Sequence, residues 1–169
     1  YGGGGDDLLM GGAGVDYASG GAGKDQIHFE NNRDRATGGD DRDSFIVHDI
    51  LPRNDKGHLS PTGDKPARIF IEDFVNGEDV LNLRRVDGHL DKKGDQPLHF
   101  AGYERYDASD GLDDLEKGYV NDTSPGSVTI FLDESGDTLV IVNRDSDRLR
   151  EMEIVLHGDV GDIRHDLLL

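Results

Sequence analysis

The stretch that decides the fold runs from Gly2 to Ile46 and reads GGGGDDLLM, GGAGVDYAS, GGAGKDQIH, FENNRDRAT and GGDDRDSFI. These five segments follow one another without a gap, and each has nine residues. The sixth position is always aspartate: Asp7, Asp16, Asp25, Asp34 and Asp43. The eighth position is always apolar: Leu9, Ala18, Ile27, Ala36 and Phe45. A period kept in phase over five segments predicts a stacked array of short turns and short strands.

The repeat has the form G-G-x-G-x-D-x-U-x, where U is apolar, and this form is typical of a parallel β-roll that binds Ca²⁺. Glycine reaches positive φ, so a short turn can direct its carbonyl groups inward. Ca²⁺ takes about six to eight oxygen ligands, and carbonyls together with a carboxylate supply them. Besides the five aspartates, the candidate ligands are the residues at the first and third positions of the well-formed turns: Gly2, Gly4, Gly11, Ala13, Gly20, Ala22, Gly38 and Asp40.

One turn and one strand make half a coil, so a full coil spans two segments. The large apolar residues Leu9, Ile27 and Phe45 alternate with alanines, which predicts one sheet with large and one with small inward side chains. Stacking then predicts about two or three Ca²⁺ sites. Their aspartate pairs are Asp7 with Asp25, Asp25 with Asp43, and Asp16 with Asp34. The fourth segment is degenerate, because Phe29, Glu30 and Asn32 replace its glycines, and Asp41 replaces the third glycine of the fifth.

The composition bounds the function. The chain has 169 residues, no cysteine, and 36 acidic against 18 basic side chains, for a formal net charge of −18. Absence of cysteine excludes disulfide scaffolds, Fe–S clusters and cysteine-based zinc sites. The acidity argues against nucleic acid and anionic membranes as partners. Such a charge favours either disorder or neutralisation by cations, and the fixed phase of aspartate and apolar residues favours cations over a flexible glycine-rich linker. Since the chain begins at Tyr1, we expect it to be a fragment of a longer protein.

After Ile46 the period ends, and a polar loop is expected over residues 51–66. Strand alternation follows in ARIFIEDF, EDVLNL and PLHFAGY, and SVTIFL with TLVIV forms the clearest hairpin around the turn DESGD. LREMEIVLHG is a further strand, and residues 112–117 are expected to form one helical turn. The fold class predicted is therefore all-β. A parallel β-roll over residues 1–50 is followed, in one continuous module, by an antiparallel β-sandwich-like cap over residues 51–169.

Two stretches carry a family resemblance. The nonapeptide segments resemble RTX (repeats-in-toxin) proteins. The segment IFIEDFVNGEDVLNL, residues 69–83, is similar to the I-x-D-F-x-x-G-x-D-x-I-D-L segment of serralysin-type C-terminal domains, with Asn82 where that family usually has aspartate. The hairpin FLDESGDTLVIV and the strand MEIVLHG also resemble that domain, whereas residues 84–126 match no family pattern. RTX modules of about this size also occur in mannuronan C5-epimerases.

The resemblance implies a Ca²⁺-dependent C-terminal module of a secreted, extracellular protein. Such modules stay unfolded in the Ca²⁺-poor cytosol, leave through a type I secretion exporter and fold outside, carrying an upstream effector domain of the same polypeptide. The tail Asp166, Leu167, Leu168 and Leu169 is similar to the secretion signal of that group. The seven histidines contain no His-Glu-x-x-His zinc motif and the chain has no G-x-S-x-G elbow, so the fragment is expected to be non-catalytic.

Two further hypotheses concern charged side chains. The alternative function is binding of an anionic polysaccharide such as alginate. The candidate contacts, which could also be solvated surface charges, are Arg84, Arg85, Lys92, Lys93, Arg144, Arg148 and Arg150. Asp73 and Asp79 either hold a peripheral Ca²⁺ ion or cap a turn. For Asp133 and Asp137, a plain acidic hairpin turn is favoured over a further Ca²⁺ site, because the spacing lacks an EF-hand's ligand run.

Overall fold

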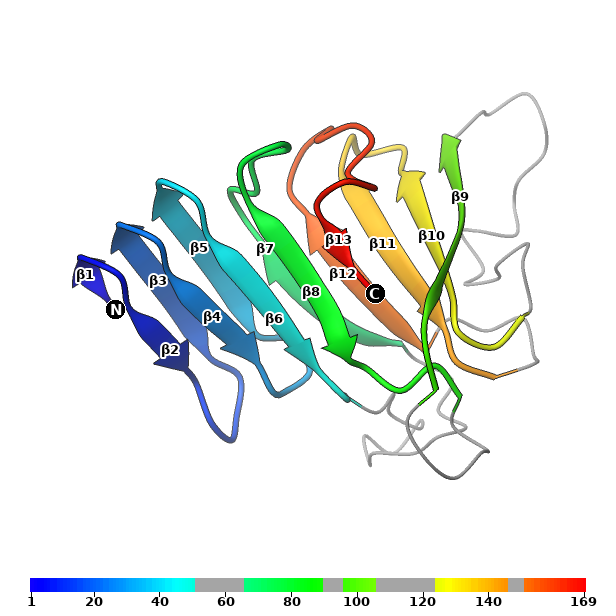
Figure 1. Ribbon diagram of the computed structural model, residues 1–169, viewed down its shortest axis with the longest axis horizontal. Helices are drawn as coiled ribbons and strands as arrows, with labels where there is room; N and C mark the ends of the chain where they lie inside the picture. Colours follow the sequence, from blue (N-terminus) through cyan, green and yellow to red (C-terminus); the bar gives the residue numbers. More distant parts are fainter. Residues whose placement is uncertain (51–65, 90–95, 106–123, 146–150) are drawn as a thin grey trace.

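The chain forms two β-sheets that stack face to face (Figure 1). The computed structural model describes residues 1–50, 66–89, 96–105, 124–145 and 151–169. Over these residues it contains strands and turns but no helix, and so no helix that could cross a membrane. One sheet has eight strands in the order β1-β3-β5-β7-β12-β11-β10-β9, and the other has five in the order β13-β8-β6-β4-β2. The all-β prediction is confirmed; the helical turn expected at residues 112–117 lies outside the described residues.

The N-terminal part is a parallel β-roll in which the chain alternates between the two sheets. Its strands are β1 (Gly3–Gly4), β2 (Leu8–Met10), β3 (Tyr17–Ala22), β4 (Gln26–Phe29), β5 (Arg35–Asp40) and β6 (Ser44–His48). Strands two apart in sequence pair in parallel, with Leu9 opposite Ile27 and Ile27 opposite Phe45 in one sheet. Ala18 lies opposite Ala36 in the other sheet. The 18-residue coil and the division into large and small inward residues are thus as the period predicts.

The roll continues beyond the repeats. Strand β7 (Ala67–Ile71) pairs in parallel with β5, and β8 (Val80–Arg85) pairs in parallel with β6. Together they make one more coil, although residues 67–85 do not follow the nine-residue period. The sheets therefore run without a break across residue 50, where the sequence led us to separate roll from cap.

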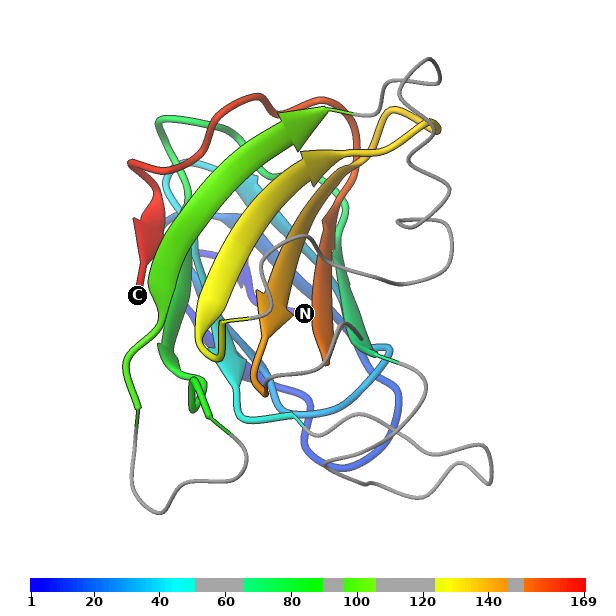
Figure 2. The ribbon, with the colours of Figure 1, turned by 90° about the vertical axis from the view of Figure 1, so that its right-hand side faces the viewer.

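The remaining strands extend and close both sheets. They are β9 (His99–Arg105), β10 (Ser127–Leu132), β11 (Thr138–Asn143), β12 (Met152–Leu156) and β13 (Leu167–Leu168). The expected hairpin is present as the antiparallel pair β10–β11, and β11–β12 is also antiparallel. The pairs that join the cap to the roll, β12–β7 and β13–β8, are parallel, as is β9–β10. In Figure 2 the strands β9 to β12 form a curved layer around the end of the roll.

The core fills the space between the sheets. One continuous apolar cluster runs from Ile27 and Phe45 in the roll to Ile130, Ile154 and Ile163 in the cap, all at most 1 % exposed. A second, smaller cluster lies on the opposite face of the cap strands and consists of Phe131, Leu139, Ile141 and Val155. Roll and cap therefore share one core.

Candidate metal centre

The repeat aspartates form a ladder along one edge of the five-stranded sheet. The backbone N–H of Asp7 donates to Oδ1 of Asp25 at 2.8 Å, and that of Asp25 donates to Oδ1 of Asp43 at 2.9 Å. The N–H of Asp43 donates in turn to Oδ1 of Asp79 at 2.9 Å. In the other sheet, where Asp16 and Asp34 directly precede β3 and β5, the N–H of Asp16 donates to Oδ1 of Asp34 at 3.0 Å. Asp25, Asp34, Asp43 and Asp79 thus fix the register between neighbouring coils, each through its Oδ1.

Four of the aspartates each have a second carboxylate oxygen that is buried without a hydrogen-bond partner. This holds for Oδ2 of Asp7, Asp16, Asp25 and Asp43. A buried carboxylate oxygen that accepts no hydrogen bond is costly, because it has lost water and gained nothing in exchange. Four such atoms at the same repeat position form a pattern, and a bound cation is the partner that satisfies it.

These oxygens point into the glycine turn of their own segment. A Cβ atom built on Gly20 would lie 2.1 Å from Oδ2 of Asp25 and 2.5 Å from the carbonyl oxygen of Gly38. One built on Gly2 would lie 2.6 Å from both Oδ2 of Asp7 and the carbonyl oxygen of Gly20. Carboxylate and carbonyl oxygens of adjacent coils therefore converge at Gly2 and Gly20, the first glycines of their segments. Glycine is required at both positions because any side chain would occupy the space.

The donor set fits Ca²⁺. Hard oxygen ligands, carbonyls included, are what Ca²⁺ prefers. Within the ranges that the structure describes, no three His, Asp or Glu side chains gather into a metal site. This agrees with sites in which backbone carbonyls from the turns complete the coordination. Some of these carbonyls also join adjacent coils: that of Ala22 accepts the N–H of Gly5, and that of Asp40 accepts the N–H of Gly23.

The turn geometry explains the glycine pattern. Positive φ occurs at the second and fourth positions of the well-formed segments, for example at Gly21 (φ 114°) and Gly23 (φ 120°). In the fifth segment Asp41 keeps this conformation with φ 72°. In the fourth segment Asn32 replaces the glycine of the fourth position, but it is the next residue, Arg33, that takes the left-handed conformation, with φ 77°. Asn32 is buried, and its side-chain oxygen accepts the backbone N–H of Arg68.

The degenerate fourth segment also lacks an open carboxylate oxygen. Oδ1 of Asp34 accepts the N–H of Asp16, and its Oδ2 accepts the N–H of Asn31 at 3.0 Å. Both oxygens of Asp34 are therefore used within the protein, whereas Oδ2 of Asp16 is free of hydrogen bonds. The pair Asp16 and Asp34 is thus less complete as a metal site than the row of Asp7, Asp25 and Asp43.

Burial disfavours the ionised form of the buried aspartates. It raises the pKa of Asp43 to about 6, with the neighbouring carboxylates Asp79 and Asp25 adding to the effect. Burial also raises the pKa of Asp34 and of Asp79. A divalent cation at the ladder would offset this cost and lower these pKa values, since metal binding displaces protons.

Asp79 and Asp73, expected either to hold a peripheral Ca²⁺ ion or to cap a turn, both accept backbone N–H groups. Asp79 is the fourth member of the ladder, and its Oδ2 accepts the N–H of Val75 at 2.8 Å. Asp73 accepts the N–H groups of Gly38 and Gly39 at 2.8 and 3.0 Å, at the turn of the fifth segment. The sequence held a signal for the first of these, because Gly77, Asp79 and Leu81 keep the G-x-D-x-U spacing of the repeat.

The arginines proposed as polysaccharide contacts separate into distinct groups. Arg84 and Arg85 are exposed at the end of β8. The prediction that Arg144 contacts a polysaccharide is wrong, because this side chain is fully buried. Its guanidinium donates to the carbonyls of Asp87 and Ile50 and pairs with Asp49. An interior arginine that holds three segments together is not available to a polymer. Lys92, Lys93, Arg148 and Arg150 lie outside the described residues.

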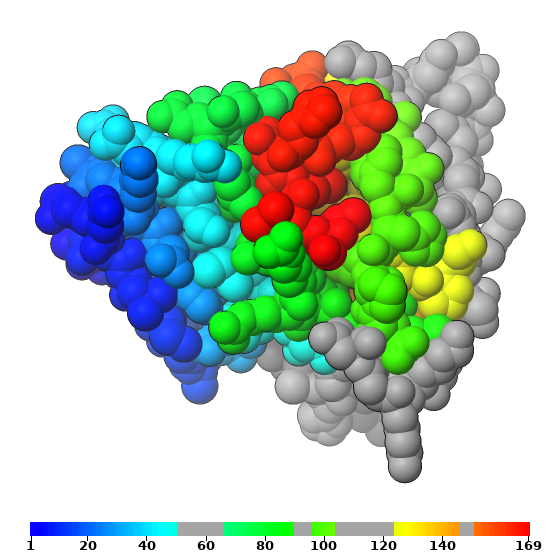
Figure 3. Space-filling model, in the orientation of Figure 1, coloured from blue at the N-terminus to red at the C-terminus, as the bar shows by residue number. Residues whose placement is uncertain are grey.

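Three other aspartates serve the fold. Oδ1 of Asp133 accepts the N–H of Asp137 across the hairpin turn, and Oδ1 of Asp137 accepts the N–H of Gly158. Asp166 is buried and accepts the N–H of Gly77 at 2.9 Å, which places Leu167 and Leu168 beside β8. Figure 3 shows this C-terminal segment on the surface beside the green strands.

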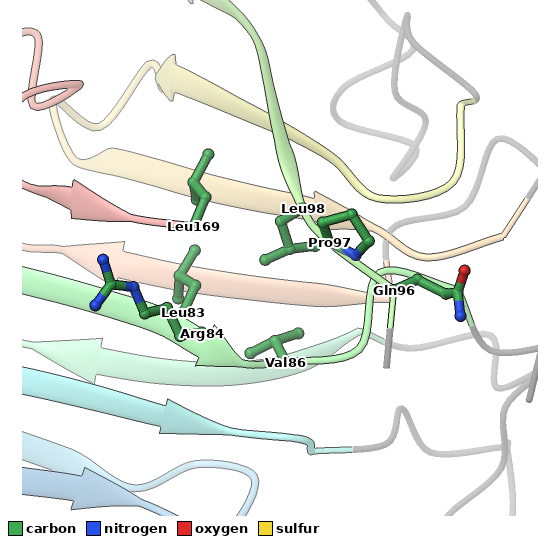
Figure 4. A pocket seen from close by; sticks show the side chains of 7 residues that line it. All are labelled: Leu83, Arg84, Val86, Gln96, Pro97, Leu98 and Leu169. Carbon is green, nitrogen blue, oxygen red and sulfur yellow. The ribbon is translucent and has the colours of Figure 1, made fainter. Parts of the chain in front are cut away.

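A cavity of about 250 Å³ lies next to the C-terminal segment. Figure 4 shows its apolar lining, which includes Leu83, Val86, Leu98 and Leu169, with Arg84 as the charged lining residue. Among the described residues that line the cavity, none offers a side-chain carboxylate, imidazole or nucleophile. The ladder is therefore the feature around which the candidate function is built.

Comparison with known proteins agrees with this geometry. Residues 1–36 match the RTX calcium-binding nonapeptide repeat in four copies. The N-terminal part, which the structure shows as a parallel β-roll, is therefore similar to the Ca²⁺-binding repeats of RTX proteins. The fifth segment lies outside the match, although Asp43 occupies the same ladder.

The whole chain is similar to a solved module. One such match is the solution structure of the AlgE6R3 subunit from the mannuronan C5-epimerase of Azotobacter vinelandii, with a TM-score of 0.54 and 17 % identity over 99 % of this chain and 80 % of that one. At this identity the likeness shows the fold. A search among curated proteins finds no match.

Proposed function

We propose that the chain is a non-catalytic RTX module of a larger secreted protein, which folds on binding extracellular Ca²⁺ and supports type I secretion of an upstream effector or enzyme domain. The observation that carries this proposal is the row of buried Oδ2 atoms without hydrogen bonds at Asp7, Asp16, Asp25 and Asp43. Without a cation the folded state holds these oxygens unsatisfied, and with Ca²⁺ it gains their ligation. Folding and metal binding are then one equilibrium.

The affinities of extracellular Ca²⁺ modules suit such a switch. Their Kd values are about 10⁻⁴ to 10⁻³ M. An ion that binds only the folded state stabilises it by RT ln(1 + [L]/Kd), so several sites together contribute several kcal/mol at extracellular Ca²⁺. The same sites contribute little in a Ca²⁺-poor cytosol, which keeps the chain competent for export.

Circular dichroism in chelator and in Ca²⁺ tests the metal part of the proposal. We expect a largely unfolded chain in EDTA and a cooperative gain of β-structure as Ca²⁺ rises to millimolar levels. Mg²⁺ at the same concentration should fail to replace it, because Mg²⁺ dehydrates reluctantly and demands octahedral geometry. A β-spectrum that is unchanged by chelator would refute the proposal.

The secretion part rests on Asp166 to Leu169 and needs its own test. A reporter joined to residues 1–169 is co-expressed with a type I exporter, and the same reporter carries Leu167→Ser, Leu168→Ser and Leu169→Ser in parallel. We expect the reporter to appear in the medium only with the intact tail. Because β13 pairs with β8, Ca²⁺-induced folding of the purified variant is measured as well. Equal export of both reporters would refute the secretion role.

Binding of an anionic polysaccharide is the second candidate. It is favoured by adjacent, exposed Arg84 and Arg85 on β8, and by the similarity in fold to an epimerase subunit. Calorimetric titration of the Ca²⁺-loaded module with alginate oligomers tests it. The double variant Arg84→Gln, Arg85→Gln should abolish the heat, whereas Arg42→Gln, another exposed arginine, should not. No heat with the unmodified module would eliminate this function.

A further inference from the structure

Two histidines meet on the outer face of the five-stranded sheet. His28 lies near the end of β4 and His48 at the end of the neighbouring strand β6. Nδ1 of His28 lies 2.8 Å from Nε2 of His48, with the ring centroids 5.1 Å apart. Side chains alternate between the two faces of a strand. Because the neighbouring residues Phe29 and Val47 are buried in the core, His28 and His48 lie on the outer face. Both imidazoles therefore stand outside, half-buried, and away from the aspartate ladder.

The separation of the two nitrogens suits one kind of metal geometry. Metal–imidazole bonds are about 2.0 Å long, so two nitrogens at right angles about the metal lie about 2.8 Å apart. At the tetrahedral angle the same bonds would separate them by about 3.3 Å. Right angles belong to square-planar or tetragonal sites, which Cu²⁺ and Ni²⁺ prefer, whereas Zn²⁺ prefers the tetrahedron. A tetragonal metal ion would replace the proton that the two nitrogens share and would lie about 1.4 Å to the side of the line between them.

A third donor lies beside the pair. Met10 on β2 is in register with His28 on β4, and the order of the sheet places them on adjacent strands. Its neighbour Leu9 faces the core, so the Met10 side chain lies on the outer face, where it is 56 % exposed. Thioether sulfur is a soft ligand that is found at a long distance beside two histidines in copper sites. Among tetragonal ions this favours copper over nickel.

The electrostatics permit metal binding at neutral pH. Burial, followed by the charges of His48 and Arg85, lowers the pKa of His28, with Glu30 acting in the opposite direction. A neutral imidazole is the form that binds metal, and less proton competition favours it. Ca²⁺ does not compete here, because it selects oxygen ligands. We propose that His28 and His48 form a bidentate Cu²⁺ site on the outer face of the five-stranded sheet, with Met10 as an additional weak ligand.

The test is a Cu²⁺ titration of the Ca²⁺-saturated module, with excess Ca²⁺ to occupy carboxylates and glycine as a competing chelator. Visible absorption gives the affinity, and electron paramagnetic resonance counts the nitrogen ligands. We expect one tight site with two imidazole nitrogens, bound in the order Cu²⁺ above Ni²⁺ and Zn²⁺. His28→Gln and His48→Gln should each weaken Cu²⁺ by at least about tenfold. The matched control is His165→Gln, at an exposed histidine elsewhere, which should leave the affinity unchanged.

The outcomes separate the pair from unspecific binding. Unchanged affinity in both single variants, equal loss in His165→Gln, or a spectrum without two nitrogen ligands would overturn the site. Met10→Leu should cause a smaller loss than either histidine variant, and no loss would overturn the role of Met10. Circular dichroism of each variant in Ca²⁺ confirms that the roll is folded, so a lost site is not mistaken for a lost fold.

Discussion

Replacing Asp43 by asparagine separates the cost of a buried carboxylate from the benefit of the metal ion. The side chain is 1 % exposed, and its Oδ1 accepts the N–H of Asp25. Asparagine keeps an oxygen for that bond but replaces the negative Oδ2 by an amide group of similar size. The register between the coils is therefore retained while the metal ligand is removed.

The magnitude follows from the pKa of Asp43, which burial raises from 3.8 to about 6. The folded state thus binds the proton more tightly than the unfolded state. At pH 7 the ionised carboxylate costs the Ca²⁺-free fold about 3 kcal/mol relative to its protonated form. The asparagine amide carries no charge, so Asp43→Asn should stabilise the Ca²⁺-free fold at pH 7 by up to about 3 kcal/mol. The gain should disappear below about pH 4, where Asp43 is protonated in both states.

In Ca²⁺ the variant should respond more weakly. Near saturation each bound ion adds about 1.4 kcal/mol of stability for every tenfold rise in Ca²⁺. Loss of one ion should reduce this slope by that amount. Circular dichroism in EDTA measures the fraction of folded protein, which the substitution should raise, and urea unfolding at several Ca²⁺ concentrations measures the slope. The control is Asp41→Asn, which removes the same charge from an exposed residue of the same turn.

Two results would refute the reasoning. One is an Asp43→Asn protein with no larger folded fraction than the unmodified protein in EDTA at pH 7, because the buried charge would then not be the source of the cost. The other is an unchanged Ca²⁺ slope, because Asp43 would then not be a ligand.

Three other predictions concern the turns, the pH and the buried arginine. Gly20→Ala should lower the free energy of unfolding in Ca²⁺ by about 1–3 kcal/mol, because its Cβ would lie 2.1 Å from Oδ2 of Asp25. Thermal unfolding measures this loss. The control is Gly4→Ala, which has open space around it and should leave the stability unchanged. As pH falls from 7 to 5, calorimetry should show weaker Ca²⁺ binding, since protons compete at Asp43 with its pKa of about 6, while the Ca²⁺-free fold gains stability; an affinity independent of pH would contradict this. Arg144→Met should destabilise the protein by about 3–5 kcal/mol, because the carbonyls of Ile50 and Asp87 lose their donor; urea unfolding checks it, and a loss no larger than that of Arg42→Met would contradict it.

The period explains why the roll could be predicted in such detail. A nine-residue repeat determines which residues turn, which face inward and which stack, so Asp7, Asp25 and Asp43 could be aligned from their spacing alone. The direction of their two oxygens could not, because it depends on how adjacent coils are offset. The coil formed by β7 and β8 was missed, since the intervening residues break the period and only Gly77, Asp79 and Leu81 retain its spacing.

The cap could be predicted only element by element. Alternation identified β10, β11 and β12, and their antiparallel pairing follows from short connections. The parallel pairing of β12 with β7 joins segments far apart in sequence, and local patterns contain no information about such a choice. Arg144 shows the same limit: a charged side chain is normally exposed, and its burial follows from carbonyl groups that approach it from distant segments.

The way the cap closes both sheets has a consequence for the order of folding. β7 and β12 bring together Arg68 and Glu153, 85 residues apart, and β8 and β13 bring together Gly77 and Asp166, 89 residues apart. Contacts of such long range must bear the entropy of closing a large loop before they contribute stability, which slows folding. The repeats alone are local in sequence, but the core they share with the cap is not. Folding should therefore proceed as one late, cooperative event that waits for residues 151–169, and the kinetic barrier lies in that long-range closure rather than in the repeats.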